Sequence, residues 1–318
     1  MQAVVAPQQN KIRTVMDWLD GRIIGQRPLI ERLVTALLCG GHLLVEGAPG
    51  LAKTRAIKEL ASAVHGDFHR IQFTPDLLPS DVTGTEVYRP EDGSFRFQQG
   101  PIFHNLVLAD EVNRAPAKVQ SALLEAMAER QVSIGRETYP LPELFLVMAT
   151  QNPIEQEGTY PLPEAQLDRF LMEIDVDYPD RDAERRILFE TTGAEETLAK
   201  GSMNADALIT AQRLIRRLPV GDSVVEAILS LVRSARPGEE SGETGKFIAW
   251  GPGPRASQSL MLAVRARALI DGRLAPSIDD VLDLAEPILK HRMALTFQAR
   301  AEGRTIPDVI RQLKTRIG

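Results

Sequence analysis

The sequence has little of what a secreted or membrane-inserted protein needs. Cys39 is the only cysteine, so no disulfide can form within the chain. Its position in an apolar run indicates a buried thiol, and a reducing, cytoplasmic compartment fits this usage. No stretch approaches the roughly 18 apolar residues of a membrane span. Because the first residues contain no basic segment followed by an apolar one, we also expect no secretory signal.

Histidine and positive charge are too sparse for a histidine metal cluster or an extended nucleic-acid-binding surface. The sequence has five histidines, and His65 and His69, which are four apart, are separated by the helix-breaking Gly66, so we expect no histidine metal cluster. The net charge of -6 argues against a protein that coats nucleic acid. Basic residues dominate only the last segment: Lys290, Arg292, Arg300, Arg304, Arg311, Lys314 and Arg316. We interpret this run as a solvated helix face or a subunit contact, and we expect no nucleic-acid partner.

Length and composition indicate a folded protein of two domains. A chain of 318 residues exceeds the size that one hydrophobic core usually serves. Hydrophobic residues make up 43% of the sequence and charged residues 25%, so a large core is available and extensive disorder is not expected.

A glycine-rich segment follows the first apolar run, residues 42–46, and opens a helical pattern. It reads Gly47, Ala48, Pro49, Gly50, Leu51, Ala52, Lys53 and Thr54. Such a loop directs backbone N–H groups at a phosphate, adds a lysine ammonium, and offers a hydroxyl that can ligate Mg²⁺. Ala52 departs from the glycine that the pattern asks for. The alternative is a turn between strand and helix that exposes Lys53.

A second apolar run, residues 106–111, ends in two adjacent carboxylates. A continuous apolar run is typical of a strand buried on both faces, and parallel sheets bind ligands where such strands end. We therefore predict that Asp110 holds the Mg²⁺ shell and that Glu111 polarises an attacking water. The alternative is an Asp-Glu pair that caps the next helix.

Strand and helix patterns alternate through the first half of the chain. Strands are predicted at residues 42–46, 69–73, 105–110, 144–150 and 170–177. This alternation predicts an α/β fold with a parallel sheet and helices on both faces. Two intervals, residues 86–99 and 132–141, are typical of β-hairpins. These hairpins either contact a partner or line a pore, or they are surface loops with no specific role.

After about residue 179 we expect helices alone. Apolar residues recur at helical spacing in residues 181–191, 205–217, 223–235, 257–270, 278–291 and 307–317, with glycine and proline between them. These segments predict a small helical domain, and residues 237–253 a loop.

Taken together, these motifs resemble the MoxR family of AAA+ ATPases. The segments that carry the resemblance are residues 47–54, 73–81, 106–116, 149–153, 162–170 and 251–256, which occur in family order over nearly the whole chain. Alanine at position 52 is itself usual in this family. The resemblance implies a five-stranded parallel P-loop sheet domain, residues 1–180, with two hairpin insertions, and a C-terminal all-α lid domain, residues 181–318.

The resemblance assigns further roles by position. Asn152 matches the sensor that orients the attacking water, and Arg169 matches the arginine finger that reaches a neighbouring subunit's nucleotide. Arg255 matches the second sensor, which ties the lid to the phosphates, and Ile24-Gly25 matches the adenine-contacting segment. Arg114 is a candidate for a further intersubunit arginine. Each of the three main assignments has an alternative: Asn152 could start a turn, Arg169 could form a surface ion pair, and Arg255 could be a surface arginine at a helix start.

The family implies a Mg²⁺-dependent ATPase that binds ATP and ADP and forms a homo-oligomeric ring, hexameric by analogy. It implies a chaperone that remodels or matures a client protein carrying a von Willebrand factor A domain. An alternative is a nucleotide-gated scaffold with little turnover, although Glu111 and Arg169 would then be unnecessary. A DNA-directed motor is a third hypothesis, against which the acidic composition argues.

Overall fold

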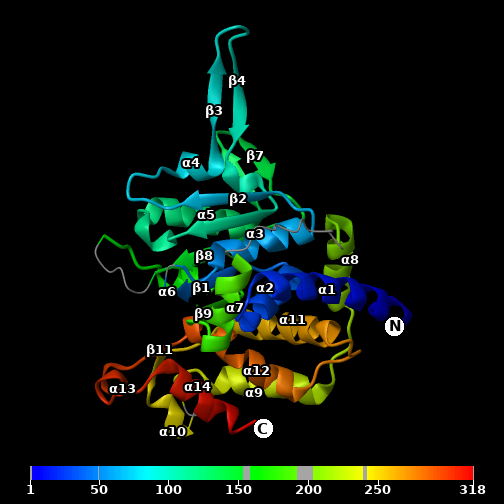
Figure 1. The fold of residues 1–318 in the computed structure, drawn as a ribbon. Coiled ribbons are helices and arrows are strands. Elements are labelled where there is room, and N and C mark those ends of the chain that lie inside the picture. Colours follow the sequence, from blue (N-terminus) through cyan, green and yellow to red (C-terminus); the bar gives the residue numbers. More distant parts are fainter. Residues whose placement is uncertain (1, 49, 153–157, 192–202, 239–241, 318) are drawn as a thin grey trace.

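A parallel sheet forms the centre of the upper part of the molecule (Figure 1). The computed structural model describes residues 2–48, 50–152, 158–191, 203–238 and 242–317. The strands are β1 (Leu43–Gly47), β2 (Phe68–Gln72), β5 (Leu106–Asp110), β8 (Leu146–Gln151) and β9 (Met172–Val176), in the order β2-β5-β8-β1-β9. All of their pairings are parallel. The predicted α/β fold is confirmed, and each strand begins and ends within two residues of its prediction.

Helices cover both faces of this sheet because its strands are apolar on both sides. Leu43 and Val45 of β1 face a core shared with α1 (Gln2–Arg22), α2 (Arg27–Cys39) and α3 (Lys53–Ala63). Leu44, between them in sequence, faces a second core with α5 (Ala117–Glu129). Alternate side chains of a strand point to opposite faces, so one short run supplies both cores.

Both predicted hairpins are present. The first consists of β3 (Gly84–Arg89) and β4 (Ser94–Gln99), and it extends far from the sheet domain (Figure 1). The second consists of β6 (Gln131–Ile134) and β7 (Glu137–Pro140). The short elements α4 (Pro79–Thr83) and η1 (Pro101–Phe103) flank the first hairpin. Phe97 stacks on Tyr139 with ring centroids 4.1 Å apart, so the hairpins support each other.

The C-terminal part is helical, as predicted. Its helices are α7 (Arg181–Thr191), α8 (Ala205–Ile215), α9 (Asp222–Ser234), α10 (Gly242–Gly245), α11 (Pro254–Ile270), α12 (Ile278–Leu289), α13 (Phe297–Ala301) and α14 (Ile306–Lys314). The expectation of helices alone after about residue 179 is wrong in one place, because β10 (Ile248–Trp250) pairs with β11 (Ala294–Leu295). None of the described helices has the length and apolar character that crossing a bilayer requires.

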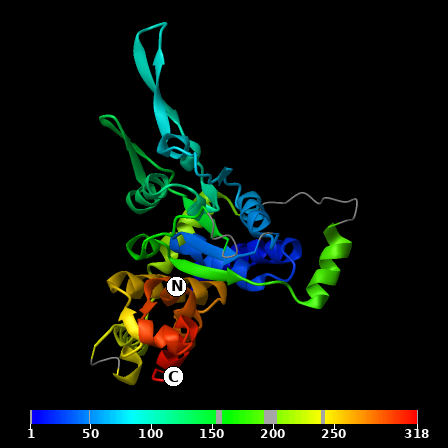
Figure 2. The ribbon, with the colours of Figure 1, turned by 90° about the vertical axis from the view of Figure 1, so that its left-hand side faces the viewer.

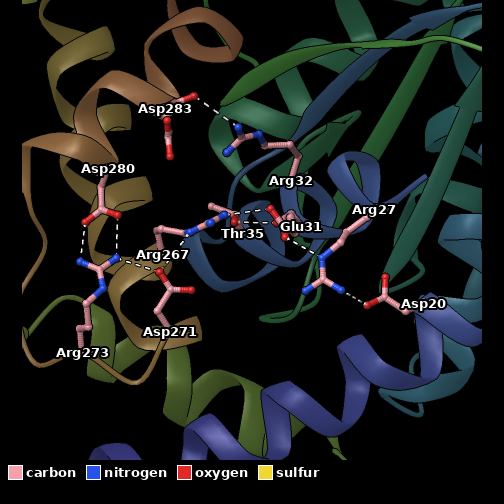
Figure 3. A network of polar contacts seen from close by, with 10 residues as sticks. All are labelled: Asp20, Arg27, Glu31, Arg32, Thr35, Arg267, Asp271, Arg273, Asp280 and Asp283. Carbon is pink, nitrogen blue, oxygen red and sulfur yellow. Dashed lines mark hydrogen bonds and ion pairs between the residues drawn. The ribbon is translucent and has the colours of Figure 1, made fainter. Parts of the chain in front are cut away.

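A polar network joins the N-terminal helices to the helical part (Figure 3). Glu31 of α2 accepts hydrogen bonds from Arg27, at 3.1 Å, and from Arg267 of α11, at 2.9 Å. Further along, Arg273 donates to both carboxylate oxygens of Asp280, at 2.8 and 2.6 Å. The apolar core of α1 and α2 also continues into α8, α9, α11 and α12. The two parts therefore pack as one body, and the division at residue 180 stays a prediction.

Candidate functional site

The glycine-rich segment forms a loop between β1 and α3, as a phosphate-binding loop does. Gly47 ends β1 so close to β9 that a Cβ atom there would lie 2.7 Å from the carbonyl oxygen of Val176. Gly50 and Ala52 both have left-handed backbone, with φ of 84° and 60°. Pro49 lies outside the described residues. A loop that alternates in this way can turn successive N–H groups toward one anion.

Lys53 begins α3 and folds back over the loop. Its Nζ donates to the carbonyl oxygen of Gly47 at 2.5 Å. Burial lowers the pKa of this ammonium below its ordinary value, while the carboxylates of Asp110, Glu111 and Glu46 oppose that shift. A triphosphate beside Lys53 would supply further negative charge to a cation that is already half-buried.

The two carboxylates at the end of β5, Asp110 and Glu111, are held by donors on the neighbouring strands. Thr150 Oγ1 donates to Asp110 Oδ1 at 2.5 Å, and the backbone N–H of Glu111 donates to Thr150 Oγ1 at 2.9 Å. Arg70 of β2 forms an ion pair with Asp110 Oδ2 at 2.5 Å. Asp110 is therefore held in place by two partners, and it lines the same cavity as the loop.

Glu111 has a strained backbone, with φ of 57°. Non-glycine residues in this region cost about 1–3 kcal/mol and cluster at functional sites. Its Oε2 accepts from Gln72 Nε2 at 2.7 Å and pairs with Arg114 Nε at 3.1 Å. Arg114 thus lies beside Glu111 of its own chain. Sequence reasoning missed Gln72, Arg70 and Thr150, whose roles depend on strand pairing such as that of Gln72 with Asp110.

A cavity of about 360 Å³ joins these groups at the carboxyl ends of the strands. Its lining includes eight predicted site residues: Gly50, Leu51, Ala52, Lys53, Thr54, Asp110, Glu111 and Asn152. Asn152 directly follows β8 and is 7% exposed. The structure therefore brings loop, carboxylates and amide to one place.

The Ile24-Gly25 segment lies at the same edge of the sheet. Gly25 has a φ of 76°, and a Cβ atom there would lie 2.7 Å from Ala183 Cβ in α7, the helix that follows β9. The neighbouring Gln26 donates from Nε2 to the carbonyl oxygen of Asp177 at 2.9 Å. Because β9 pairs with β1 as far as Gly47, this segment lies beside the phosphate-binding loop.

Arg169 and Arg255 lie at the opposite side of the sheet, where the amino ends of the strands meet. Arg169 precedes β9 and donates from Nη1 to the carbonyl oxygen of Leu124 at 2.7 Å. Arg255 begins α11 and pairs with Asp168 at 3.1 Å. Both line a second cavity, of about 260 Å³. The amino and carboxyl ends of a five-residue strand are about 13 Å apart, so within one chain these arginines do not meet the loop.

The second cavity contains two arginines that sequence reasoning missed, Arg130 and Arg292. Arg292 is 1% exposed, and its Nε donates to Asp168 Oδ1 at 2.7 Å. The interpretation of the C-terminal basic run as a solvated face is therefore wrong for Arg292. His42 lines the cavity too, and burial, reinforced by Arg130, lowers the pKa of His42 to about 3, so the imidazole is neutral.

This loop, with its carboxylates and amide at the carboxyl edge of a parallel sheet and a helical domain behind it, defines a P-loop ATPase of the AAA+ class. Residues 42–172 match the ATPase family associated with various cellular activities (AAA), and residues 243–313 match the AAA lid domain. A solved structure of a putative ATPase from Cytophaga hutchinsonii superposes with a TM-score of 0.91, at 41% identity, covering 98% of this chain and 95% of that one.

Curated relatives define the family more closely. Chaperone MoxR1 of Mycobacterium tuberculosis is 46% identical over 88% of this chain and 74% of its own length. Protein MoxR of Paracoccus denitrificans is 32% identical over 98% and 96%. YeaC of Bacillus subtilis, whose name states no function, is 42% identical over 93% and 90%. The chain belongs to the MoxR family of AAA+ ATPase chaperones.

Proposed function

We propose that this ATPase acts as an assembly in which a neighbouring copy completes each active site. The observation that supports it is the separation of two half-sites in one chain: Lys53 and Glu111 at one edge of the sheet, Arg169 and Arg255 at the other. Guanidinium groups at the second edge would reach the phosphates of another copy. We propose a homo-oligomeric ring, and its hexameric state rests on the family resemblance alone.

In the proposed mechanism, water attacks the γ-phosphorus of ATP and the bond to the ADP oxygen breaks. Glu111 accepts the proton of the attacking water, and the amide of Asn152 orients that water without competing as a base. Lys53 binds the β- and γ-phosphates. Arg169 and Arg255 of the neighbouring copy would balance the charge that develops on the transferring phosphoryl group.

We propose that Thr54 and Asp110 hold Mg²⁺. A hydroxyl and a carboxylate are the hard oxygen donors that this ion prefers, and both line the cavity beside Lys53. When bound, Mg²⁺ supplies charge neutralisation on the phosphates. Asp110 is already oriented by Thr150 and balanced by Arg70, which fits a carboxylate that serves a cation. Ile24 and Gly25 are proposed to contact the adenine of ATP or ADP.

The proposed client is a protein whose state the ring remodels or matures. The relative named Chaperone MoxR1 and the two projecting hairpins support a protein client. That the client carries a von Willebrand factor A domain rests on the family resemblance alone.

Assembly can be tested by dilution. We expect turnover per subunit to fall as the protein is diluted below its assembly concentration with saturating ATP and Mg²⁺, by up to roughly 10³–10⁵-fold, which is the contribution of an arginine finger. Phosphate release and mass photometry, measured on the same samples, check this. Turnover that stays constant where single subunits dominate would contradict shared sites, and chelating Mg²⁺ should abolish turnover at every concentration.

Gln72 provides a test of the carboxylate's position. Its amide holds the carboxylate of Glu111, so Gln72→Leu should release the base and raise basal turnover by roughly tenfold to a hundredfold, the effect of one hydrogen bond to a charged group. Gln98→Leu, at an exposed position on β4, is the matched control and should leave turnover unchanged. A decrease on replacing Gln72 would show instead that Gln72 supports catalysis.

A further inference from the structure

A slot lies between the two hairpins, apart from both cavities of the active site. Its volume is about 390 Å³, and its walls come from α4, the start of β3, α5 and the whole of β6. Figure 2 shows both hairpins projecting from the same side of the sheet domain. The slot is large enough to be a binding site, and catalysis as proposed makes no use of it.

One wall of the slot is an open strand edge. Within the described residues, β6 pairs with β7 alone, and all four of its residues line the slot. The N–H of Leu141 donates to the carbonyl oxygen of Arg130 at 2.9 Å, and bonded pairs alternate along an antiparallel ladder. Ser133 and Thr138 therefore form a non-bonded pair, so the N–H and C=O of Ser133 point away from β7, and Ser133 itself lines the slot.

The side chains of this edge offer no protection against strand addition. Natural edge strands carry charges, proline or bulges that block pairing with another chain. The four residues of β6, Gln131–Ile134, include no charge and no proline. No charged side chain and no proline of β6 therefore blocks the approach of another strand.

The floor of the slot is negatively charged. Glu125 and Glu129 of α5 are four residues apart, a like-charge spacing that destabilises a helix. In the described part of the chain neither forms an ion pair, and no lysine or arginine lines the slot. Ala122 and Ala126 line the slot with them, and these small side chains let another backbone approach the helix closely.

We propose that the slot binds an extended client segment in which lysine or arginine alternates with uncharged residues. The segment would add to β6 as a strand, with its backbone bonded to Ser133 and its basic side chains, all on one face, directed at Glu125 and Glu129. Strand addition supplies affinity and the two carboxylates supply selectivity. The inference gives the chemistry of the client segment and so rests on the proposed chaperone function.

Two proline variants of the full-length protein test the strand addition. The probe is a short fluorescein-labelled peptide in which lysine alternates with threonine or valine. Its binding is measured by fluorescence anisotropy. Ser133→Pro removes the N–H that faces the slot and should weaken binding at least roughly tenfold. Thr138→Pro is the matched control, because it removes an outward N–H on the opposite edge of the same hairpin and the same contact between the two hydroxyls. Equal weakening by both, or no binding to the native chain, would overturn the proposal.

A charge exchange tests the selectivity. Glu125→Lys combined with Glu129→Lys should weaken the lysine peptide and strengthen an otherwise identical glutamate peptide, each by roughly fivefold or more. Glu137→Lys, on the outer strand of the hairpin, should change neither. Unchanged preference in the double variant would overturn the role of α5.

The same samples separate this inference from the proposed function. Peptide binding is measured without turnover, so loss of ATPase activity in Glu111→Gln should leave it intact. If Ser133→Pro dissociates the assembly in mass photometry while the peptide still binds, the slot is a contact between copies of the chain and the inference is wrong.

Discussion

Glu111→Gln is expected to bind ATP as the native chain does and to lose turnover by roughly 10²–10⁴-fold, the contribution of a positioned general base. The amide preserves the volume of the side chain and can still bond to Gln72, so the loop and the cavity should keep their shape. It cannot accept the proton of the attacking water. Single-turnover phosphate release gives the chemical step, and a fluorescent ATP analogue gives binding.

The control for this variant is Glu91→Gln, which removes one carboxylate from the exposed turn between β3 and β4. It should leave both measurements unchanged. Undiminished phosphate release in Glu111→Gln would remove Glu111 from the role of base. If that variant also matured a client normally, the scaffold hypothesis would gain support over the chaperone that hydrolyses ATP.

Arg169→Ala is expected to lower turnover by roughly 10³–10⁵-fold, as loss of an arginine finger does in nucleotide hydrolases. Lys53→Ala should be inactive as well, because the loop loses the ammonium that meets the phosphates. Each variant keeps the half of the site that the other lacks. Mixing the two should therefore restore part of the turnover, wherever an intact loop meets an intact arginine.

Arg213→Ala is the matched control for this experiment. Arg213 forms an exposed ion pair with Glu143, with 72% and 65% of the two side chains accessible, so its loss should leave turnover unchanged. Mixtures that stay inactive at concentrations at which mass photometry shows mixed assemblies would contradict catalysis between subunits.

The elements of the fold could be predicted because their signals are local. The buried strand β5 reads as a continuous apolar run, and α7 has helical spacing over the same residues, Arg181–Thr191, that it occupies in the structure. The ladder between β10 and β11 was missed because strands of three and two residues are too short for a periodic signal. Their pairing depends on contact across more than 40 residues.

The candidate site was only partly predictable for the same reason. Lys53, Thr54, Asp110 and Glu111 belong to contiguous motifs, and the structure brings them together. The donors on β2 depend on strand order, which spacing along the chain does not contain. Arg292 is buried against Asp168, which is 124 residues away in the sequence, so a local count of charges could not find this partner.

The opposite placement of the two half-sites has a consequence for stoichiometry. Subunits that join loop edge to arginine edge form a heterologous contact, which either closes on itself or leaves two unlike ends. In an open row, the terminal loop would receive no guanidinium and would retain its triphosphate, whereas a closed circle has no such idle member. The fraction of bound ATP that resists hydrolysis would thus count the breaks in the assembly, without any image of it.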